Sequence, residues 1–139
     1  MGFLASVDRP ELLPTADEMD AEHRRWRGIA VDCAKEFDLT LTHGVAAKLI
    51  NVYMKAAFVC GGYASHPHAC ALHPPIDRLM LNELGTRNVG GIGKRWRDYA
   101  RRAWSTFDGD TYESVIADLR RVQKDRPLWM VEEHWRGHQ

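Results

Sequence analysis

One apolar segment, residues 42–60, constrains the fold of this chain more than any other. It is hydrophobic almost all round and is closed by a Gly-Gly pair, a pattern that predicts a central, buried helix. Its polar side chains Lys48, Asn51 and Lys55 recur at i, i+3 and i+7 and therefore form one stripe. Because lysine is rarely buried without a reason, this stripe is the first candidate for a functional site.

A second feature follows a loop rich in His and Pro, at the sequence Pro-Pro-Ile-Asp of residues 74–77. Asp77 opens an apolar, periodic segment that reaches Leu84, which is the signature of a helix N-cap. The sequence therefore predicts a capped helix soon after the lysine-bearing one.

The remaining apolar periodicities predict an all-α fold. Further helices are expected at residues 15–37, 94–107, 111–122 and 128–135, and residues 1–14 are expected to be an extended arm. No alternating strand pattern of useful length and no internal repeat occurs. We expect a compact bundle of about five to six helices around the central apolar helix. All 139 residues would form a single domain.

The first of these helices has an expected apolar inner face. Its members are Trp26, Ile29, Ala30, Cys33, Ala34 and Phe37.

Composition limits the partners and the compartment. Lys plus Arg equals Asp plus Glu at 19 each, so net charge does not indicate a nucleic-acid partner and the distribution of charge must do so. Three cysteines without framework spacing indicate a reducing, cytoplasmic environment. No run suggests a membrane span, and no pattern suggests an oligomer, so we expect a monomer that does not interact with membranes.

The lysine stripe and Asp77 each have two interpretations. A lysine among apolar side chains is disfavoured as an ammonium ion, and its neutral amine would be a nucleophile. Alternatively, Lys48 or Lys55 reaches the surface with its stem packed on the helix, and Asp77 is only an N-cap. The co-occurrence of the two features favours the functional interpretation.

Together the two features resemble the helix-hairpin-helix DNA glycosylases, in particular the 8-oxoguanine glycosylase fold and its compact archaeal-type branch. In that superfamily a hairpin turn of the form Leu-Pro-Gly-Val-Gly precedes the catalytic lysine, and a Pro-Val-Asp element supplies an aspartate at a later helix start. Residues 44–48, Gly-Val-Ala-Ala-Lys, look like the hairpin and lysine, and residues 75–77 look like Pro-Val-Asp. The resemblance covers residues 41–85. It departs from the pattern at His43, where the hairpin proline is usual, and at Ala46, where its second glycine is usual.

The resemblance implies a DNA glycosylase that also has AP-lyase activity and needs no cofactor. A damaged or modified base in double-stranded DNA would be flipped into a pocket, with 8-oxoguanine as the family default. Lys48 would attack C1′ and form a Schiff base, and Asp77 would stabilise charge on the sugar. Lys55 is the alternative nucleophile or a modulator of Lys48, and Asn51 could hold a phosphate, the base edge or Asp77.

DNA binding would require phosphate contacts, for which the sequence offers two places. The amides at a helix N-terminus suit one phosphate, and the basic face of the helix at residues 94–107, with the glycine loop before it, suits others. The alternative is that the basic face is only solvated. The candidates are His43, Gly44, Val45, Arg87, Lys94, Arg95, Arg97 and Arg101.

Two further sets of residues are candidates for a base pocket and for a metal site. The pocket candidates are His73, Trp129, Glu133 and Trp135, although tryptophans at helical spacing also occur in cores. Cys60, His66, His68 and Cys70 could bind zinc, but their spacing matches no zinc finger, so we expect no metal. The alternative to a glycosylase is a non-catalytic DNA-binding or zinc-stabilised interaction module on a helical scaffold.

Overall fold

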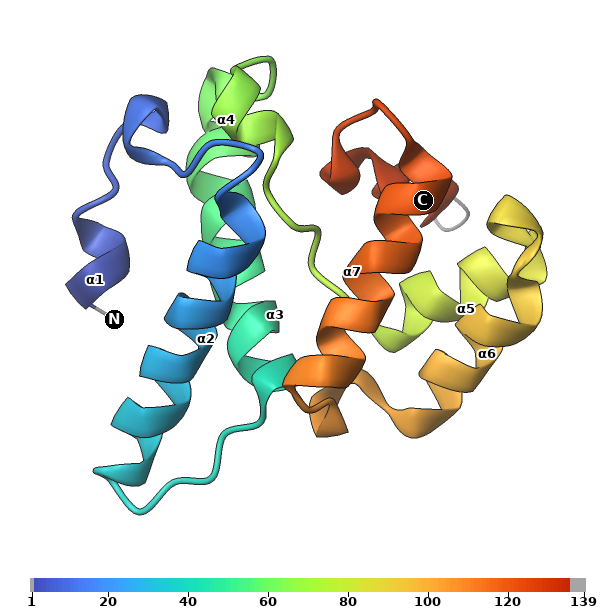
Figure 1. Cartoon of the computed structure of the whole chain (residues 1–139), viewed down its shortest axis with the longest axis horizontal. Helices are drawn as coiled ribbons and strands as arrows, with labels where there is room; N and C mark the ends of the chain where they lie inside the picture. Colours follow the sequence, from blue (N-terminus) through green and yellow to red (C-terminus); the bar gives the residue numbers. More distant parts are fainter. Residues whose placement is uncertain (1, 136–139) are drawn as a thin grey trace.

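The computed structural model describes residues 2–135, which contain only helices and the turns that connect them (Figure 1). This confirms the predicted all-α class. The α-helices are α1 (Gly2–Ala5), α2 (Met19–Lys35), α3 (His43–Met54), α4 (Pro67–Cys70), α5 (Arg78–Thr86), α6 (Gly93–Arg102) and α7 (Gly109–Gln123). The short 3-10 segments are η1 (Pro10–Leu12), η3 (Val89–Gly91), η4 (Trp104–Thr106) and η5 (Leu128–Trp135). A π-helical segment, η2 (Lys55–Tyr63), continues α3.

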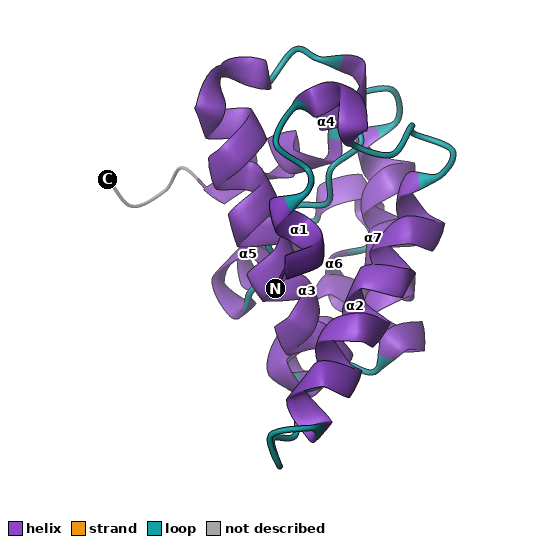
Figure 2. Ribbon diagram, turned by 90° about the vertical axis from the view of Figure 1, so that its left-hand side faces the viewer, coloured by secondary structure: helices purple, strands orange, loops and turns teal. Residues whose placement is uncertain are grey.

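The helices form two halves that share α3. Figure 1 shows α2 and α3 side by side in one half, α5 and α6 in the other, and α7 between them. One apolar cluster lies among α1, α2, α3 and residues 69–72, and the other lies among α5, α6, α7 and η5. In Figure 2, α1 lies in front of α3, where Leu4 is buried in the same cluster as Ile50 and Met54. Since Ala47 belongs to the other cluster, α3 connects both halves of the core.

Helix α3 begins as predicted but is not buried all round. The Thr42 hydroxyl accepts a hydrogen bond from the Val45 N–H at 3.1 Å, which caps the helix. One face, however, is open to solvent and carries Leu49, Val52 and Tyr53. By length and composition alone His43–Tyr63 could cross a membrane, but the polar contacts that it makes with other elements are those of a packed helix.

Helix α2 packs with a mixed face, in which Trp26 is buried as expected but polar side chains are buried beside it. Its buried residues are Met19, His23, Trp26 and Arg27. Phe37, at the end of the predicted inner face, is 75% exposed because the chain has already left the helix there and the last turns of α2 extend past the core. The predicted face is therefore correct for Trp26 and wrong for Cys33 and Phe37, which are exposed. Apolar spacing alone cannot predict the burial of polar residues of α2 whose partners lie on other helices.

Helix α6 ends earlier than predicted, so its connection to α7, residues 103–108, is longer than expected and contains a strained residue. Helix α6 ends at Arg102, and Ala103 follows with φ of 61°, a conformation that is costly for a residue with a Cβ. Asp108, and not Thr111, caps α7, because its carboxylate accepts the Thr111 N–H at 2.8 Å. This connection places η4 directly against the first turn of α3.

Candidate active site

Lys48 and Asp77 are in direct contact. The Lys48 Nζ lies 2.9 Å from Asp77 Oδ2, and the two side chains are 24% and 23% exposed. The pair is therefore shielded on most sides but still reachable from solvent. The sequence predicted that these residues would act together, and the fold brings them together from positions 29 residues apart.

Asp77 is held by the start of α5 as well as by Lys48. Its Oδ1 accepts the Met80 N–H at 2.9 Å, so one carboxylate oxygen caps the helix and the other receives the lysine. An anionic group is stabilised at a helix N-terminus by the unpaired N–H groups and the helix dipole. The two interpretations of Asp77, a cap and a partner of Lys48, are therefore compatible.

Trp104 is a residue of this site that the sequence did not indicate. The Lys48 Nζ lies 5.7 Å from the centre of the Trp104 ring, within reach of a cation–π interaction. Gly44 permits this arrangement, since a Cβ there would lie 1.9 Å from the Trp104 carbonyl oxygen. The only sequence signal was a glycine one turn before Lys48, which required a close backbone neighbour.

Lys55 does not join this pair. It forms an ion pair with Glu132 of η5, which lies outside the Lys48–Asp77 contact. The lysine stripe is thus divided between two carboxylate partners.

Asn51 lies inside the protein, at 1% exposure, and its amide is fully used. Its Nδ2 donates to the Pro74 carbonyl oxygen at 2.9 Å and to the Tyr112 hydroxyl at 3.0 Å, and its Oδ1 lies 2.8 Å from His23 Nε2. The prediction that Asn51 contacts a phosphate, a base or Asp77 is therefore wrong, because the side chain is sealed from substrate and directed at other groups.

Asn51 belongs to a larger network of hydrogen bonds, and its own bonds determine which nitrogen or oxygen carries each proton. We call this the Asn51 network, and its members are Asp20, His23, Asn51, His73 and Tyr112. Because Asn51 Oδ1 can only accept, His23 Nε2 donates to it. The Tyr112 hydroxyl, which accepts from Asn51, donates to His73 Nδ1 at 3.0 Å, and His73 Nε2 donates to Asp20 at 2.8 Å. Each neutral histidine therefore carries its proton on Nε2.

Burial keeps both histidines uncharged. It lowers the pKa of His23 well below its ordinary value, and the neighbouring His73 adds to that effect. Burial also lowers the pKa of His73, although the Asp20 carboxylate opposes the change. The two rings are 4.3 Å apart, so protonation of either would place a charge against the other.

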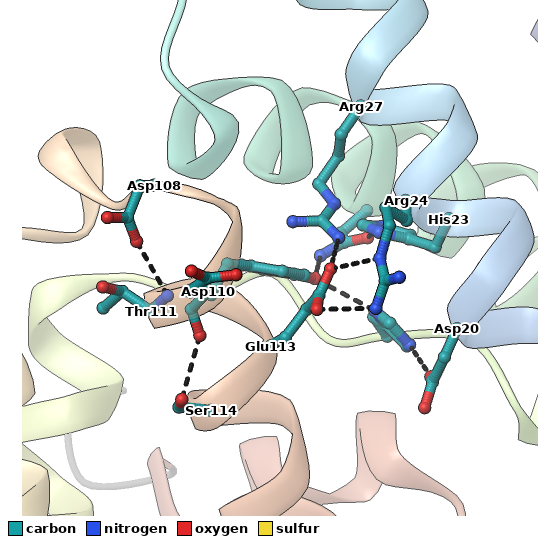
Figure 3. A network of polar contacts seen from close by, with 12 residues as sticks. Asp20, His23, Arg24, Arg27, Asp108, Asp110, Thr111, Glu113 and Ser114 are labelled. Carbon is teal, nitrogen blue, oxygen red and sulfur yellow. Dashed lines mark hydrogen bonds and ion pairs between the residues drawn. The ribbon is translucent and has the colours of Figure 1, made fainter.

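Arginines of α2 surround this network. Figure 3 shows Arg24 and Arg27 directed toward Glu113 of α7, and the contacts are 2.7 Å and 2.8 Å. Arg27 is 1% exposed and stacks over Tyr112 at 4.5 Å from the ring centre. The network therefore joins α2, α3 and α7 through polar contacts beside the apolar cluster that α2 and α3 share.

The predicted phosphate donors at the start of α3 are already occupied. The Gly44 N–H donates to the Phe107 carbonyl oxygen at 3.0 Å, and the Val45 N–H donates to Thr42. His43 directs its ring at Gly109, and its buried Nδ1 has no partner among residues 2–135. These amides are thus not available to a phosphate in the way that the sequence suggested.

The predicted basic face is largely paired within the protein. Arg95 contacts Asp118 at 3.0 Å, Arg97 donates to the Gly85 carbonyl oxygen at 2.8 Å, Arg101 pairs with Asp98 and Arg87 pairs with Glu83. Lys94 is exposed and has no ion pair among residues 2–135. Its helix follows a tight turn in which Asn88, Gly90 and Gly91 have positive φ, and Asn88 Oδ1 accepts the Gly93 N–H at 2.8 Å.

The predicted base-pocket residues do not gather around Lys48. His73 is 4% exposed inside the Asn51 network, which overturns its assignment to an open pocket. Glu133 pairs with Arg126 at 2.7 Å, and the half-buried Trp129 has an indole N–H without a partner among residues 2–135. The Trp135 side chain lies outside the described residues.

The zinc candidates make other contacts. The Cys70 thiol donates to the Ala64 carbonyl oxygen at 3.6 Å, His66 Nδ1 accepts the His68 N–H, and Cys60 is exposed. Within residues 2–135, no three or more His, Cys, Asp or Glu side chains are grouped so that they could hold a metal ion.

Comparisons of this chain with protein-family models, with curated proteins and with solved structures found no match. A function therefore has to be argued from the geometry of the chain's own residues.

Proposed function

We propose that this chain is a small DNA glycosylase with lyase activity, in which Lys48 is the nucleophile and Asp77 its partner. The observation that carries the proposal is the 2.9 Å contact between Lys48 Nζ and Asp77 Oδ2. A lysine amine that attacks a sugar carbon must first lose a proton, and a carboxylate at hydrogen-bond distance is a suitable acceptor. Partial exposure of both groups leaves room for a substrate.

Asp77 carries the protons in each step that leads to the Schiff base. The Lys48 ammonium gives one proton to Asp77, and the neutral Nζ attacks C1′ while the C1′–N bond to the base breaks. The departing base keeps the bonding electrons and takes the proton from Asp77. Asp77 then accepts a second proton from Nζ and passes it to O4′ as the C1′–O4′ bond opens, which leaves a C1′=N Schiff base.

Strand cleavage follows from the Schiff base. Loss of a proton from C2′ and departure of the 3′ phosphate break the C3′–O3′ bond, and water then releases Lys48. Asp77 serves in each proton transfer because its position is fixed by the Met80 N–H. The Trp104 ring, which lies near Nζ, offers an aromatic surface for the extruded base.

Lys94, at the start of α6, supports contact with a DNA backbone. Its side chain is exposed and has no ion pair among residues 2–135. The amides of the turn before it are occupied, as are those of Gly44 and Val45, because the N–H groups of Gly91 and Gly93 both donate to Asn88. We therefore assign the phosphate contact to the Lys94 side chain and not to backbone amides.

The proposal is tested with duplexes that each carry one modified base, in the presence of borohydride, which reduces a Schiff base to a stable amine. We expect wild type and Lys55→Ala to form a covalent adduct on the same duplex, and Lys48→Ala to form none. Base release and strand cleavage on that duplex would identify the substrate. Binding of DNA without an adduct on any duplex would contradict the proposal and favour a non-catalytic DNA-binding module.

A further inference from the structure

The segment that carries Asp77 is a buried strap without regular secondary structure. Residues 71–76 are all buried, and prolines at positions 74 and 75 restrict its backbone. Asp77 follows at once as the N-cap of α5. The location of this strap relative to α3 therefore determines where the Asp77 carboxylate stands.

Asn51 is the α3 side chain that holds the strap. It donates to the carbonyl oxygen of Pro74, three residues before Asp77, and it lies three residues after Lys48 on the same face of α3. Two contacts thus join α3 to the strap and the start of α5: Asn51 with Pro74, and Lys48 with Asp77. The first contact is sealed inside the protein, whereas the second is open.

The orientation of the Asn51 amide is fixed by the Pro74 carbonyl oxygen, which can only accept. Nδ2 must therefore face Pro74, and a reversed amide would place two acceptors against each other. With Nδ2 at Pro74 and Tyr112, Oδ1 faces His23 Nε2, which donates to it.

We propose that Asn51 is a positioning residue that sets the distance between Lys48 and Asp77 through the Pro74 carbonyl. This inference builds on the proposed function, but it concerns a contact that exists without substrate. Loss of the Asn51 amide removes the hydrogen bond that ties Pro74 to α3, while His73 keeps its contacts with Tyr112 and Asp20. The end of the strap next to Asp77 then moves more freely, and Asp77 spends less time against the Lys48 ammonium.

The test measures the reactivity of each lysine, and it needs no DNA. Reductive methylation with formaldehyde and borohydride, followed by peptide mass spectrometry, gives a rate for Lys48 and a rate for Lys55 in the same sample. Lys55 serves as the internal reference because it pairs with Glu132 and not with the strap. Asp77→Asn supplies the rate of a Lys48 that has lost its partner.

The matched variants are Asn51→Ala and Tyr112→Phe. Both remove one buried hydrogen-bonding group of the same network. Asn51→Ala cuts the link from α3 to Pro74, whereas Tyr112→Phe keeps that link and cuts the bond from α7 to His73 of the strap. We expect Asn51→Ala to raise the Lys48 rate roughly three- to tenfold, toward that of Asp77→Asn, with Lys55 unchanged. Tyr112→Phe should leave both rates within about twofold of wild type.

A second variant guards against a general loss of packing. Asn51→Leu keeps the volume of the side chain and removes every hydrogen bond, so it should raise the Lys48 rate as Asn51→Ala does. An unchanged Lys48 rate in both folded Asn51 variants would overturn the proposal, as would an equal rise at Lys55 or in Tyr112→Phe.

Where a substrate duplex is found, the Asn51 variants should lower the single-turnover rate of trapping and leave the Kd for DNA unchanged. If no duplex is trapped by wild type, the proposed function fails, while the methylation rates still decide the role of Asn51.

Discussion

The Lys48–Asp77 pair and the Asn51 network lie one helical turn apart on α3, and they differ in almost every physical respect. The pair has two charged groups that are about one quarter exposed, held by one helix cap. In the network, His23, Asn51, His73 and Tyr112 are neutral and almost fully buried, while Asp20, at 55% exposure, is the member that reaches solvent. Each hydrogen bond among the buried members determines the next. The pair can therefore exchange protons and partners, whereas the network is suited to hold a fixed geometry.

This contrast shows how one short helix can serve two purposes. Apolar residues on either side of the polar stripe attach α3 to both clusters of the core. Along the stripe, Lys48 is partly exposed, Asn51 is buried and Lys55 is again partly exposed. If the comparison is correct, changes to the pair should alter chemistry directly, whereas changes to the network should alter stability and should reach the chemistry only through the Asn51–Pro74 contact.

The largest effect is expected from Asp77→Asn. The amide cannot take a proton from Lys48, so we expect turnover on the identified duplex to fall by about 10²- to 10³-fold, with the Kd for DNA nearly unchanged. Single-turnover kinetics and a binding titration measure the two quantities. Glu132→Gln, which changes the partner of Lys55, is the control and should retain turnover; equal loss in both variants would remove the distinction between the lysines.

A large effect on stability is expected from Gly44→Ala. Its Cβ would lie 1.9 Å from the Trp104 carbonyl oxygen, so η4 must move away from α3, at a cost of roughly 2–4 kcal/mol in the free energy of unfolding. Urea denaturation measures the change. Gly28→Ala on α2 is the control, because a Cβ there meets nothing within 4 Å, and helix propensity predicts a gain of about 0.5–1 kcal/mol.

The network should make stability depend on pH. Since burial lowers the pKa of His23 and His73, the unfolded chain binds more protons than the folded one once the pH falls below about 6.5. The stability provided by the neutral histidines is therefore complete above that pH and is lost as the pH falls toward the lower folded-state pKa, at up to about 1.4 kcal/mol per pH unit for each histidine. Urea denaturation between about pH 7.5 and pH 5.5 measures this slope.

The control for the pH slope is His23→Gln, whose side-chain amide can still donate to Asn51 but does not titrate. Its slope should be clearly flatter than that of wild type. Equal slopes in the two proteins would place the titrating groups elsewhere.

The smallest effect concerns DNA affinity. Lys94 is exposed and lacks an ion pair within residues 2–135, so Lys94→Ala should reduce the slope of log K against log salt concentration by about 0.9. Arg101→Ala should change the slope less, since Arg101 already pairs with Asp98 at 2.9 Å. The reverse order would indicate that DNA displaces the Arg101 pair and lies along the other side of α6.

The sequence predicted the features that depend on local pattern. The all-α class, the start of the central helix at residues 42–43, the Asp77 cap and the association of Lys48 with Asp77 follow from periodicity, capping chemistry and the resemblance, and the structure contains all of them. A charged residue on a helix, by contrast, is ordinarily expected in solvent. That His23 and Arg27 are buried depends on partners 28 and 86 residues away, which no local pattern reveals.

The site itself was only partly predictable. Trp104 reaches Lys48 through a strained residue, Ala103, and a glycine contact, both of which depend on tertiary packing. His73 lies beside prolines and was expected in an open loop, but it is buried, and its ring bonds Tyr112 and Asp20. The amides of Gly44 and Val45 were expected to be available, but the Phe107 carbonyl oxygen and the Thr42 hydroxyl accept their hydrogen bonds.

The most direct test of the central claim is the location of the borohydride-trapped adduct. The trapped complex would be digested, and the peptide that carries the sugar remnant would be sequenced by mass spectrometry. We predict that the remnant is attached to Lys48, and that Asp77→Asn yields the same adduct more slowly. Attachment to Lys55, or to any other amine in the chain, would contradict the assignment of Lys48 and Asp77 as the catalytic pair.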